Sequence, residues 1–95
     1  MKFRKKPLVV EAFQMTAERH VNNVDWPEWL HAAWQISAPN CNALYRQREG
    51  DDSLQLQTLE GQVKITVNDW LIRGVHGELY PCKPDVFEAT YEAVP

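Results

Sequence analysis

Two short segments in which apolar and polar residues strictly alternate constrain the fold of this chain more than any other feature. Within residues 54–58, Leu54 and Leu56 alternate with polar residues, and within residues 63–67 three β-branched residues do the same. A period of two is typical of a strand with one buried face. The intervening Leu59-Glu60-Gly61 supplies a glycine for a tight reversal. The pattern therefore predicts an antiparallel β-hairpin.

The segment Asp25-Trp26-Pro27-Glu28 predicts the start of a helix, with Asp as N-cap, Pro in the first turn and Glu three residues after the cap. Apolar residues then recur at a spacing that lines one helical face. They are Trp26, Trp29, Leu30, Ala33 and Trp34. A platform of three tryptophans could stack a flat ligand, but such a stripe is more often core. We expect it to be buried against a sheet and the helix to end near residues 37–40.

The remaining segments predict further short elements. We expect strands at residues 7–15, 43–46, 70–73 and 78–80, and a last strand at residues 90–94 that pairs with the first. Residues 16–24 are polar and irregular, and turns are expected at residues 49–52, 68–69 and 74–77. Pro84 is suited to open a short helix through residue 89.

These elements predict one domain over residues 1–95, of the α+β class. The expected architecture is a small, strongly bent antiparallel sheet, or a part-open barrel, with one amphipathic helix packed on it.

Charge is mild overall but unevenly placed. The chain has 10 basic and 13 acidic residues, a net charge of −3, which is the wrong sign for a general nucleic-acid binder. Basic residues crowd the start, and acidic residues crowd the end. They are Lys2, Arg4, Lys5 and Lys6, and Asp85, Glu88 and Glu92. We expect weak surface pairing between the two ends. The alternative is a basic arm that contacts phosphates.

Location is inferred from the opening of the chain and from the cysteines. The apolar run Leu8-Val9-Val10 breaks at Glu11, short of the about 7–15 apolar residues of a signal peptide or the about 20 of a membrane span. Cys41 and Cys82 form no CxxC pair. We therefore expect a cytoplasmic protein with reduced thiols and no membrane partner.

Catalytic and cofactor motifs are missing from the sequence. His20, His31 and His76 do not stand at the spacings of zinc ligands, and no nucleophile elbow or phosphate-cradling glycine loop occurs. Asp51 and Asp52 are expected in a solvated turn. The sequence thus predicts no metal site and no cofactor, and it disfavours an enzyme.

The densest run of chemically useful side chains lies between residues 69 and 91. Arg73 and Lys83 could converge on an anion at the start of the helix that Pro84 opens. Trp70 and Tyr80 could add stacking, and His76 lies in the intervening turn. The predicted ligand-binding residues are Arg73, Lys83, Tyr80, Trp70 and His76. The alternative is that the rings are core and the two cations are solvated.

The stretch NDWLIRGVHGELYPCKPDVFEATYE, residues 68–92, resembles the C-terminal signature of a family of small phage and prophage proteins. The opening MKFRKKP, followed by VVEAFQ, is similar to the N-terminus of that family. The resemblance covers residues 1–15 and about 58–92, and the family is essentially uncharacterised. Family members usually have Pro-Gly where this chain has Val67-Asn68. Asn also tolerates the left-handed conformation, so we expect the turn to persist.

The resemblance implies a phage-encoded accessory protein working in the cytoplasm of the host cell. Our leading hypothesis is that it acts without catalysis, by binding a host defence component. The partner would be a host protein or a small phosphate-bearing signal such as a nucleotide. The alternative is a structural or morphogenesis-associated minor phage protein. Two terminal strands at sheet edges also predict a homo-oligomer, because exposed edges invite pairing.

Overall fold

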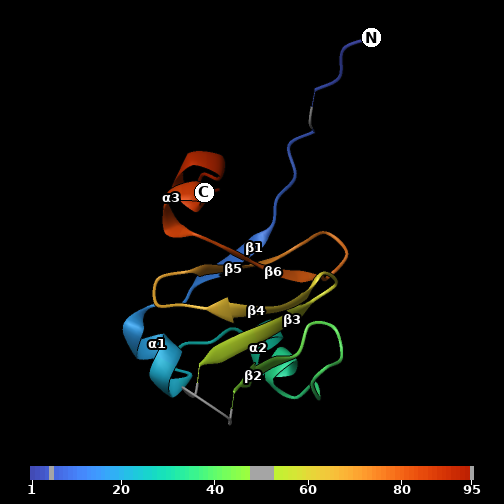
Figure 1. The fold of residues 1–95 in the computed structure, drawn as a ribbon. Coiled ribbons are helices and arrows are strands. Elements are labelled where there is room, and N and C mark those ends of the chain that lie inside the picture. The colour runs from blue at the N-terminus through green and yellow to red at the C-terminus, as the bar shows by residue number, and fades with distance from the viewer. Residues whose placement is uncertain (5, 48–52, 95) are drawn as a thin grey trace.

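The computed structural model describes residues 1–4, 6–47 and 53–94. Within these ranges the chain forms two open antiparallel sheets of three strands each and three short helices, which confirms the α+β class (Figure 1). The strand orders are β1-β5-β6 in the first sheet and β2-β3-β4 in the second. The strands are β1 (Glu11–Gln14), β2 (Leu44–Arg46), β3 (Leu54–Thr58), β4 (Gly61–Ile65), β5 (Trp70–Arg73) and β6 (Leu79–Cys82). The helices are α1 (Ala17–Asn22), α2 (Glu28–Trp34) and α3 (Pro84–Thr90).

The second sheet contains the hairpin predicted from the alternating pattern. Leu54 lies opposite Ile65, and Leu56 lies opposite Val63, so the apolar residues of both strands share one face. Gly61 has a φ of 122°, a conformation that a side chain would strain. The predicted edge strand at residues 43–46 is also confirmed, as β2, which among the described strands pairs with β3 alone.

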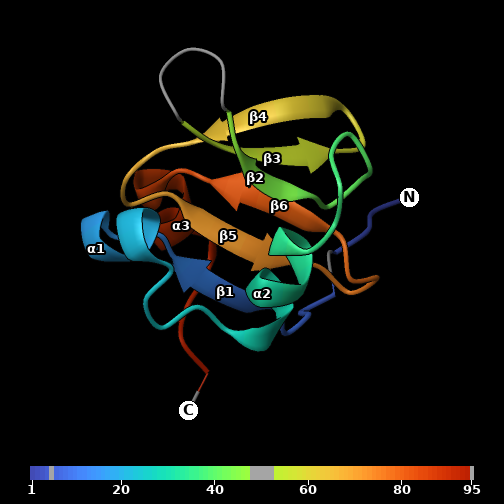
Figure 2. The ribbon, with the colours of Figure 1, turned by 90° about the horizontal axis from the view of Figure 1, so that it is seen from below.

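The first sheet is covered on both faces. In Figures 1 and 2, α3 lies on one side of it, and α2 lies with the second sheet on the other. Along β5, Leu71 faces the main core, while Trp70 and Ile72 share the opposite face. This alternation follows from the period of two in a strand. Ile72 is fully buried although it lies outside the main core, which indicates a second, smaller packing layer beneath α3.

The tryptophan stripe is buried as predicted. Leu30 and Ala33 of α2 join the main core with Trp26, while Trp29 and Trp34 pack against it half-buried. The rings of Trp26 and Trp34 meet edge-on, with centroids 5.5 Å apart. These rings therefore pack against the core and do not form a platform for stacking a flat ligand. The helix ends at Trp34, before the expected stop at residues 37–40.

The expectation that Asp25 caps this helix is wrong. The N-cap of α2 is Pro27, and no side chain caps it. Asp25 has a left-handed backbone, with a φ of 61°, and its carboxylate lies 4.0 Å from the guanidinium of Arg19. The buried indole of Trp26 donates to the carbonyl oxygen of Arg19 at 2.9 Å. This tertiary contact holds Trp26 outside the helix, which therefore begins later than the local signal indicates.

Residues 16–24 were expected to be irregular, and this prediction is also wrong because they contain α1. The helix is held by contacts with two strands of the second sheet. A ring nitrogen of His20 lies 2.9 Å from the carbonyl oxygen of Ile65 on β4, and the Arg46 guanidinium on β2 donates to the backbone carbonyl of His20. Such distant partners leave no local signal, and a six-residue helix gains little from propensity alone.

Both termini differ from the prediction. The first strand covers only Glu11–Gln14, because β5, its partner, ends at Arg73, where Gly74 opens the turn into β6. The chain before it forms an extended N-terminal arm, residues 1–4 and 6–10, that projects from the body (Figure 1). Residues 91–94 form no strand and follow α3 as a tail. The expected pairing of first and last strands is therefore wrong.

The expected ion pairing of the two ends is also missing from the described residues. No ion pair joins Lys2, Arg4 or Lys6 to an acidic side chain there. Lys5 and the expected turn at 49–52, with Asp51 and Asp52, lie outside the described residues. Among the helices described, none has the length and apolar character needed to cross a bilayer.

Candidate functional site

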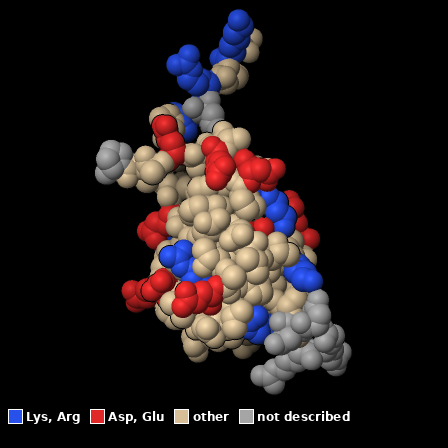
Figure 3. All heavy atoms as spheres, turned by 90° about the vertical axis from the view of Figure 1, so that its left-hand side faces the viewer, with Lys and Arg blue, Asp and Glu red and all other residues tan. Residues whose placement is uncertain are grey.

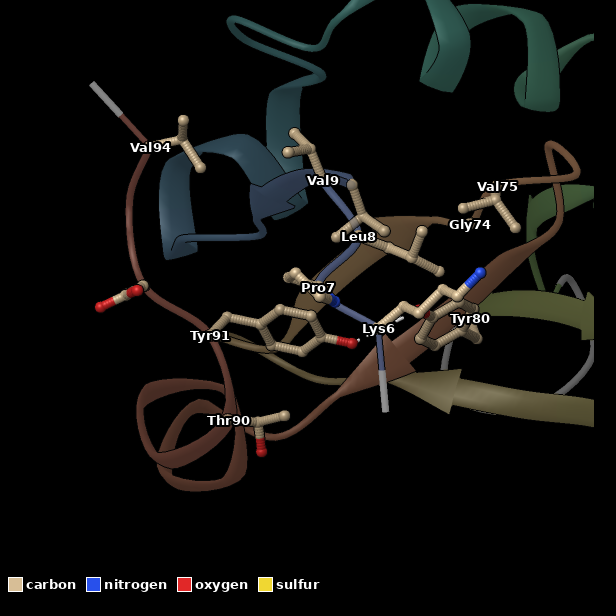
Figure 4. A pocket seen from close by; sticks show the side chains of 12 residues that line it. Lys6, Pro7, Leu8, Val9, Gly74, Val75, Tyr80, Thr90, Tyr91 and Val94 are labelled. Carbon is tan, nitrogen blue, oxygen red and sulfur yellow. Dashed lines mark hydrogen bonds between the residues drawn. The ribbon is translucent and has the colours of Figure 1, made fainter. Parts of the chain in front are cut away.

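A hollow of the described surface lies where the N-terminal arm meets the rest of the molecule. It has a volume of about 540 Å³, and we call it the arm groove. In Figure 4 the arm runs between Tyr91 and Val94 of the tail on one side and the turn with Val75 on the other. The lining residues are Lys6, Pro7, Leu8, Val9, Val10, Gly74, Val75, Tyr80, Thr90, Tyr91, Glu92 and Val94. Aliphatic side chains and two phenols dominate this lining, with one cation and one carboxylate.

Helix α3 places Tyr91 at the arm groove through a run of stacked rings. Trp70 and Phe87 stack face to face, with ring centroids 3.9 Å apart and an interplanar angle of 6°. Phe87 in turn stacks on Tyr91 at 5.0 Å, and the hydroxyls of Tyr91 and Tyr80 lie 3.4 Å apart. The aromatic residues of the short helix therefore fix one wall of the groove on the outer face of the first sheet.

Burial, reinforced by the hydrogen bond with Tyr91, raises the pKa of Tyr80 from 10.0 to about 12. The phenol is therefore neutral at physiological pH and can donate or accept a hydrogen bond in the groove. Because ionisation is disfavoured in the folded state, the stability linked to Tyr80 is complete below pH 10. It is lost as the pH rises from about 10 to about 12.

The Tyr91→Phe variant should lower the pKa of Tyr80 towards, but not to, its ordinary value, because burial persists when the hydrogen bond is lost. Phenolate absorbance during an alkaline titration measures this shift. Tyr45→Phe is the matched control, since Tyr45 lies on β2 in the other sheet and should leave the last titration step unchanged. If the titration step at the highest pH were unchanged in the Tyr91→Phe variant, the hydrogen bond with Tyr91 would not contribute to the raised pKa of Tyr80.

The two predicted cations do not converge. Arg73 lies opposite Leu79 at the turn end of the β5–β6 hairpin, and its guanidinium is 3.8 Å from a Glu11 carboxylate oxygen. Lys83 follows β6 at the opposite end, where its ammonium is 3.1 Å from both carboxylate oxygens of Asp69. Each cation thus has its own carboxylate. The arrangement needed for an anion between them, at the start of α3, is not formed.

The other predicted residues are also dispersed. One face of Trp70 is covered by Phe87, and His76 is exposed in the turn, where its backbone N–H donates to Glu78 at 2.9 Å. Of the five predicted residues, Tyr80 alone lines the arm groove. The sequence pattern missed Tyr91, Val94 and the arm. The sequence signal for the arm is the apolar run Leu8-Val9-Val10, which the pattern assigns to a strand.

A buried polar cluster close to the predicted site was also missed. The carboxylate of Asp69 is almost fully buried. It accepts hydrogen bonds from the backbone N–H of Thr66 at 2.9 Å and from its hydroxyl at 3.0 Å. With the Lys83 contact, this cluster ties the β4–β5 turn to the start of α3. Asn68 in that turn has a φ of 74°, so the expected left-handed residue is present.

Metal and thiol chemistry find little support in the described part of the chain. No group of three or more His, Cys, Asp and Glu side chains there could hold a metal ion. Cys41 and Cys82 are free thiols. Burial, with smaller effects of the Asp85 and Asp69 carboxylates, raises the pKa of Cys82. Its thiol therefore stays protonated at neutral pH, which disfavours a nucleophilic role.

The chain matches no protein-family model, no curated protein and no solved structure at a significant level.

Proposed function

We propose that this chain is an accessory protein of a phage or prophage that acts by binding a host protein, with the arm groove as its binding surface. The lining of that groove carries the proposal. Tyr80 and Tyr91 are of a residue type on which protein interfaces concentrate binding energy, and the aliphatic side chains beside them can exclude water from a contact. A binding role fits the sequence-based expectation that catalysis is not involved.

A protein partner is better supported than a small phosphate-bearing signal. A phosphate ligand needs converging cations, and Arg73 and Lys83 lie at opposite ends of a hairpin, each beside a carboxylate. The groove itself has one cation, Lys6, balanced by Glu92. Apolar lining without a phosphate cradle favours side chains of another protein.

Affinity capture from host lysate, paired with a phage-infection assay, tests this function. Val9→Asp places a charge on an exposed groove residue, whereas Val67→Asp places the same charge on an exposed residue outside the groove lining. We expect Val9→Asp to lose both the captured protein and the infection phenotype, and Val67→Asp to keep both. Equal behaviour of the two variants would contradict a role for the groove.

A structural role in the phage particle is the second candidate, based on the same resemblance. Mass spectrometry of purified particles separates the two candidates. A structural protein should co-purify with particles at a fixed ratio, whereas an accessory protein that acts in the host cell should be depleted from them.

A further inference from the structure

The described residues of the N-terminal arm are mostly exposed. A compact chain of this length has a radius of gyration of about 12 Å. The observed value is 14.1 Å, and the longest dimension is 49 Å against 26 and 22 Å for the others. A folded monomer of this mass exposes about 5,600 Å². This chain exposes 7013 Å², a surplus of about 1,400 Å² by the same scaling.

The arm exposes apolar side chains. Phe3 is 89% exposed, Leu8 62% and Val9 75%. Among the described residues, β1 loses its partner strand where β5 turns at Gly74, so no strand pairs with the arm. Contiguous exposed apolar residues of this kind mark interaction surfaces.

The charge of the arm indicates which kind of surface it can bind. Lys2, Arg4 and Lys6 make it basic, while the exposed side chains of Asp85, Glu88 and Glu92 make α3 and the tail acidic. Among the described residues, neither set forms an ion pair. Figure 3 shows acidic side chains on the upper part of the body, just below the basic side chains of the arm, as well as others lower on the same face. The protein thus carries two complementary surfaces, both unpaired within one chain.

We propose that a second copy of this chain occupies the arm groove in the free protein. The two arms would cross in opposite directions about a two-fold axis, so that the basic tip of each lies along the acidic α3 and tail of the other. Each chain contributes its arm to the partner's acidic surface and its own acidic surface to the partner's arm. The contact is therefore symmetric, and the assembly closes as a dimer. A standard interface buries about 800 Å² per partner, which the surplus of each chain can supply.

The dimer uses the same arm groove as the proposed function, but it forms without a host partner. A host protein that uses the groove would then displace the second copy. The dimer is measured on purified protein alone, whereas the proposed function is measured by host capture and infection. Failure of one is therefore distinguishable from failure of the other.

Sedimentation or light scattering of the full chain at micromolar concentration gives the first test. We expect twice the chain mass of 11.0 kDa, with dissociation as salt rises because exposed ion pairs are screened. Leu8→Asp should give the single-chain mass, and Val67→Asp should keep the dimer. A single-chain mass for the unaltered protein at all concentrations and at low salt would overturn the proposal.

Charge exchange gives the sharper test. Lys2→Glu with Arg4→Glu and Lys6→Glu makes the arm net negative, and Glu88→Lys with Glu92→Lys makes the acidic surface net positive. Each of these two variants alone should be monomeric, with at least a tenfold weaker self-association, because its two surfaces then repel. Mixed in equal amounts, the two should restore a dimer, since each arm again meets a surface of opposite charge. Dimers that persist in both variants, or a mixture that stays monomeric, would contradict the reciprocal contact.

Discussion

Replacing Trp26 with alanine should lower the free energy of unfolding by about 3–5 kcal/mol. Trp26 is 5% exposed, belongs to the main core and meets Trp34 edge-on, so its loss leaves a cavity where α2 packs. The variant also leaves the carbonyl oxygen of Arg19 without the indole donor that lies 2.9 Å away. In a domain whose total stability is of order 5–15 kcal/mol, this loss is a large fraction of the free energy of unfolding. Urea denaturation followed by far-ultraviolet circular dichroism measures it.

Two further variants separate packing from hydrogen bonding at this position. Trp26→Phe keeps most of the ring volume and removes the N–H, so it should cost less than Trp26→Ala. Glu28→Ala, in the first turn of α2 and exposed, is the matched control and should change stability by at most about 0.5 kcal/mol. If Trp26→Ala and Glu28→Ala were equally stable, the assignment of Trp26 to the core would be contradicted.

The elements that the sequence predicts correctly are those specified by neighbouring residues. The β3–β4 hairpin follows from alternation plus one glycine, and Asn68 takes the left-handed conformation expected of its turn. Pro84 opens α3 as expected, although the helix extends one residue further, to Thr90. In each case the signal lies within a few residues of the structure that it specifies.

The elements that the sequence does not predict depend on distant partners. Helix α1 is held by Ile65 and Arg46, which lie 45 and 26 residues from His20. Asp25 carries a strong local capping signal, but the tertiary contact between Trp26 and Arg19 moves the start of α2 past it. Local preferences of this kind are weak priors, which tertiary packing overrides.

The candidate site was predicted less well for the same reason. Arg73 and Lys83 are ten positions apart in sequence, which says nothing of the register that puts them at opposite ends of a hairpin. The arm groove joins residues 6–10 to residues 90–94, and no pattern within either segment indicates the other. Several prominent residues of the stretch that suggests the phage resemblance support the fold. Asp69 and Lys83 hold a turn, and Phe87 docks α3 on Trp70.

Asp69 provides the second large effect, because Asp69→Ala should lower the free energy of unfolding by about 2–4 kcal/mol. Breaking a buried ion pair costs about 3–5 kcal/mol, but the Lys83 side chain is 60% exposed and regains water, which reduces the ionic part. The backbone N–H of Thr66 also loses its acceptor at 2.9 Å, and a typical hydrogen bond contributes about 0.5–1.5 kcal/mol. The loss of both contacts loosens the turn between the two sheets.

Matched variants test whether the stabilising effect of Asp69 comes from its hydrogen-bond acceptor or from its negative charge. Asp69→Asn keeps an acceptor for Thr66 but loses the ionic contact with Lys83, so it should be less destabilising than Asp69→Ala. Asp85→Ala removes an exposed carboxylate from the first turn of α3, and should stay within about 0.5 kcal/mol of the unaltered protein. Urea denaturation ranks the three. If Asp69→Ala were no more destabilising than Asp85→Ala, the buried cluster would not hold the β4–β5 turn, and α3 would depend on its stacked rings alone.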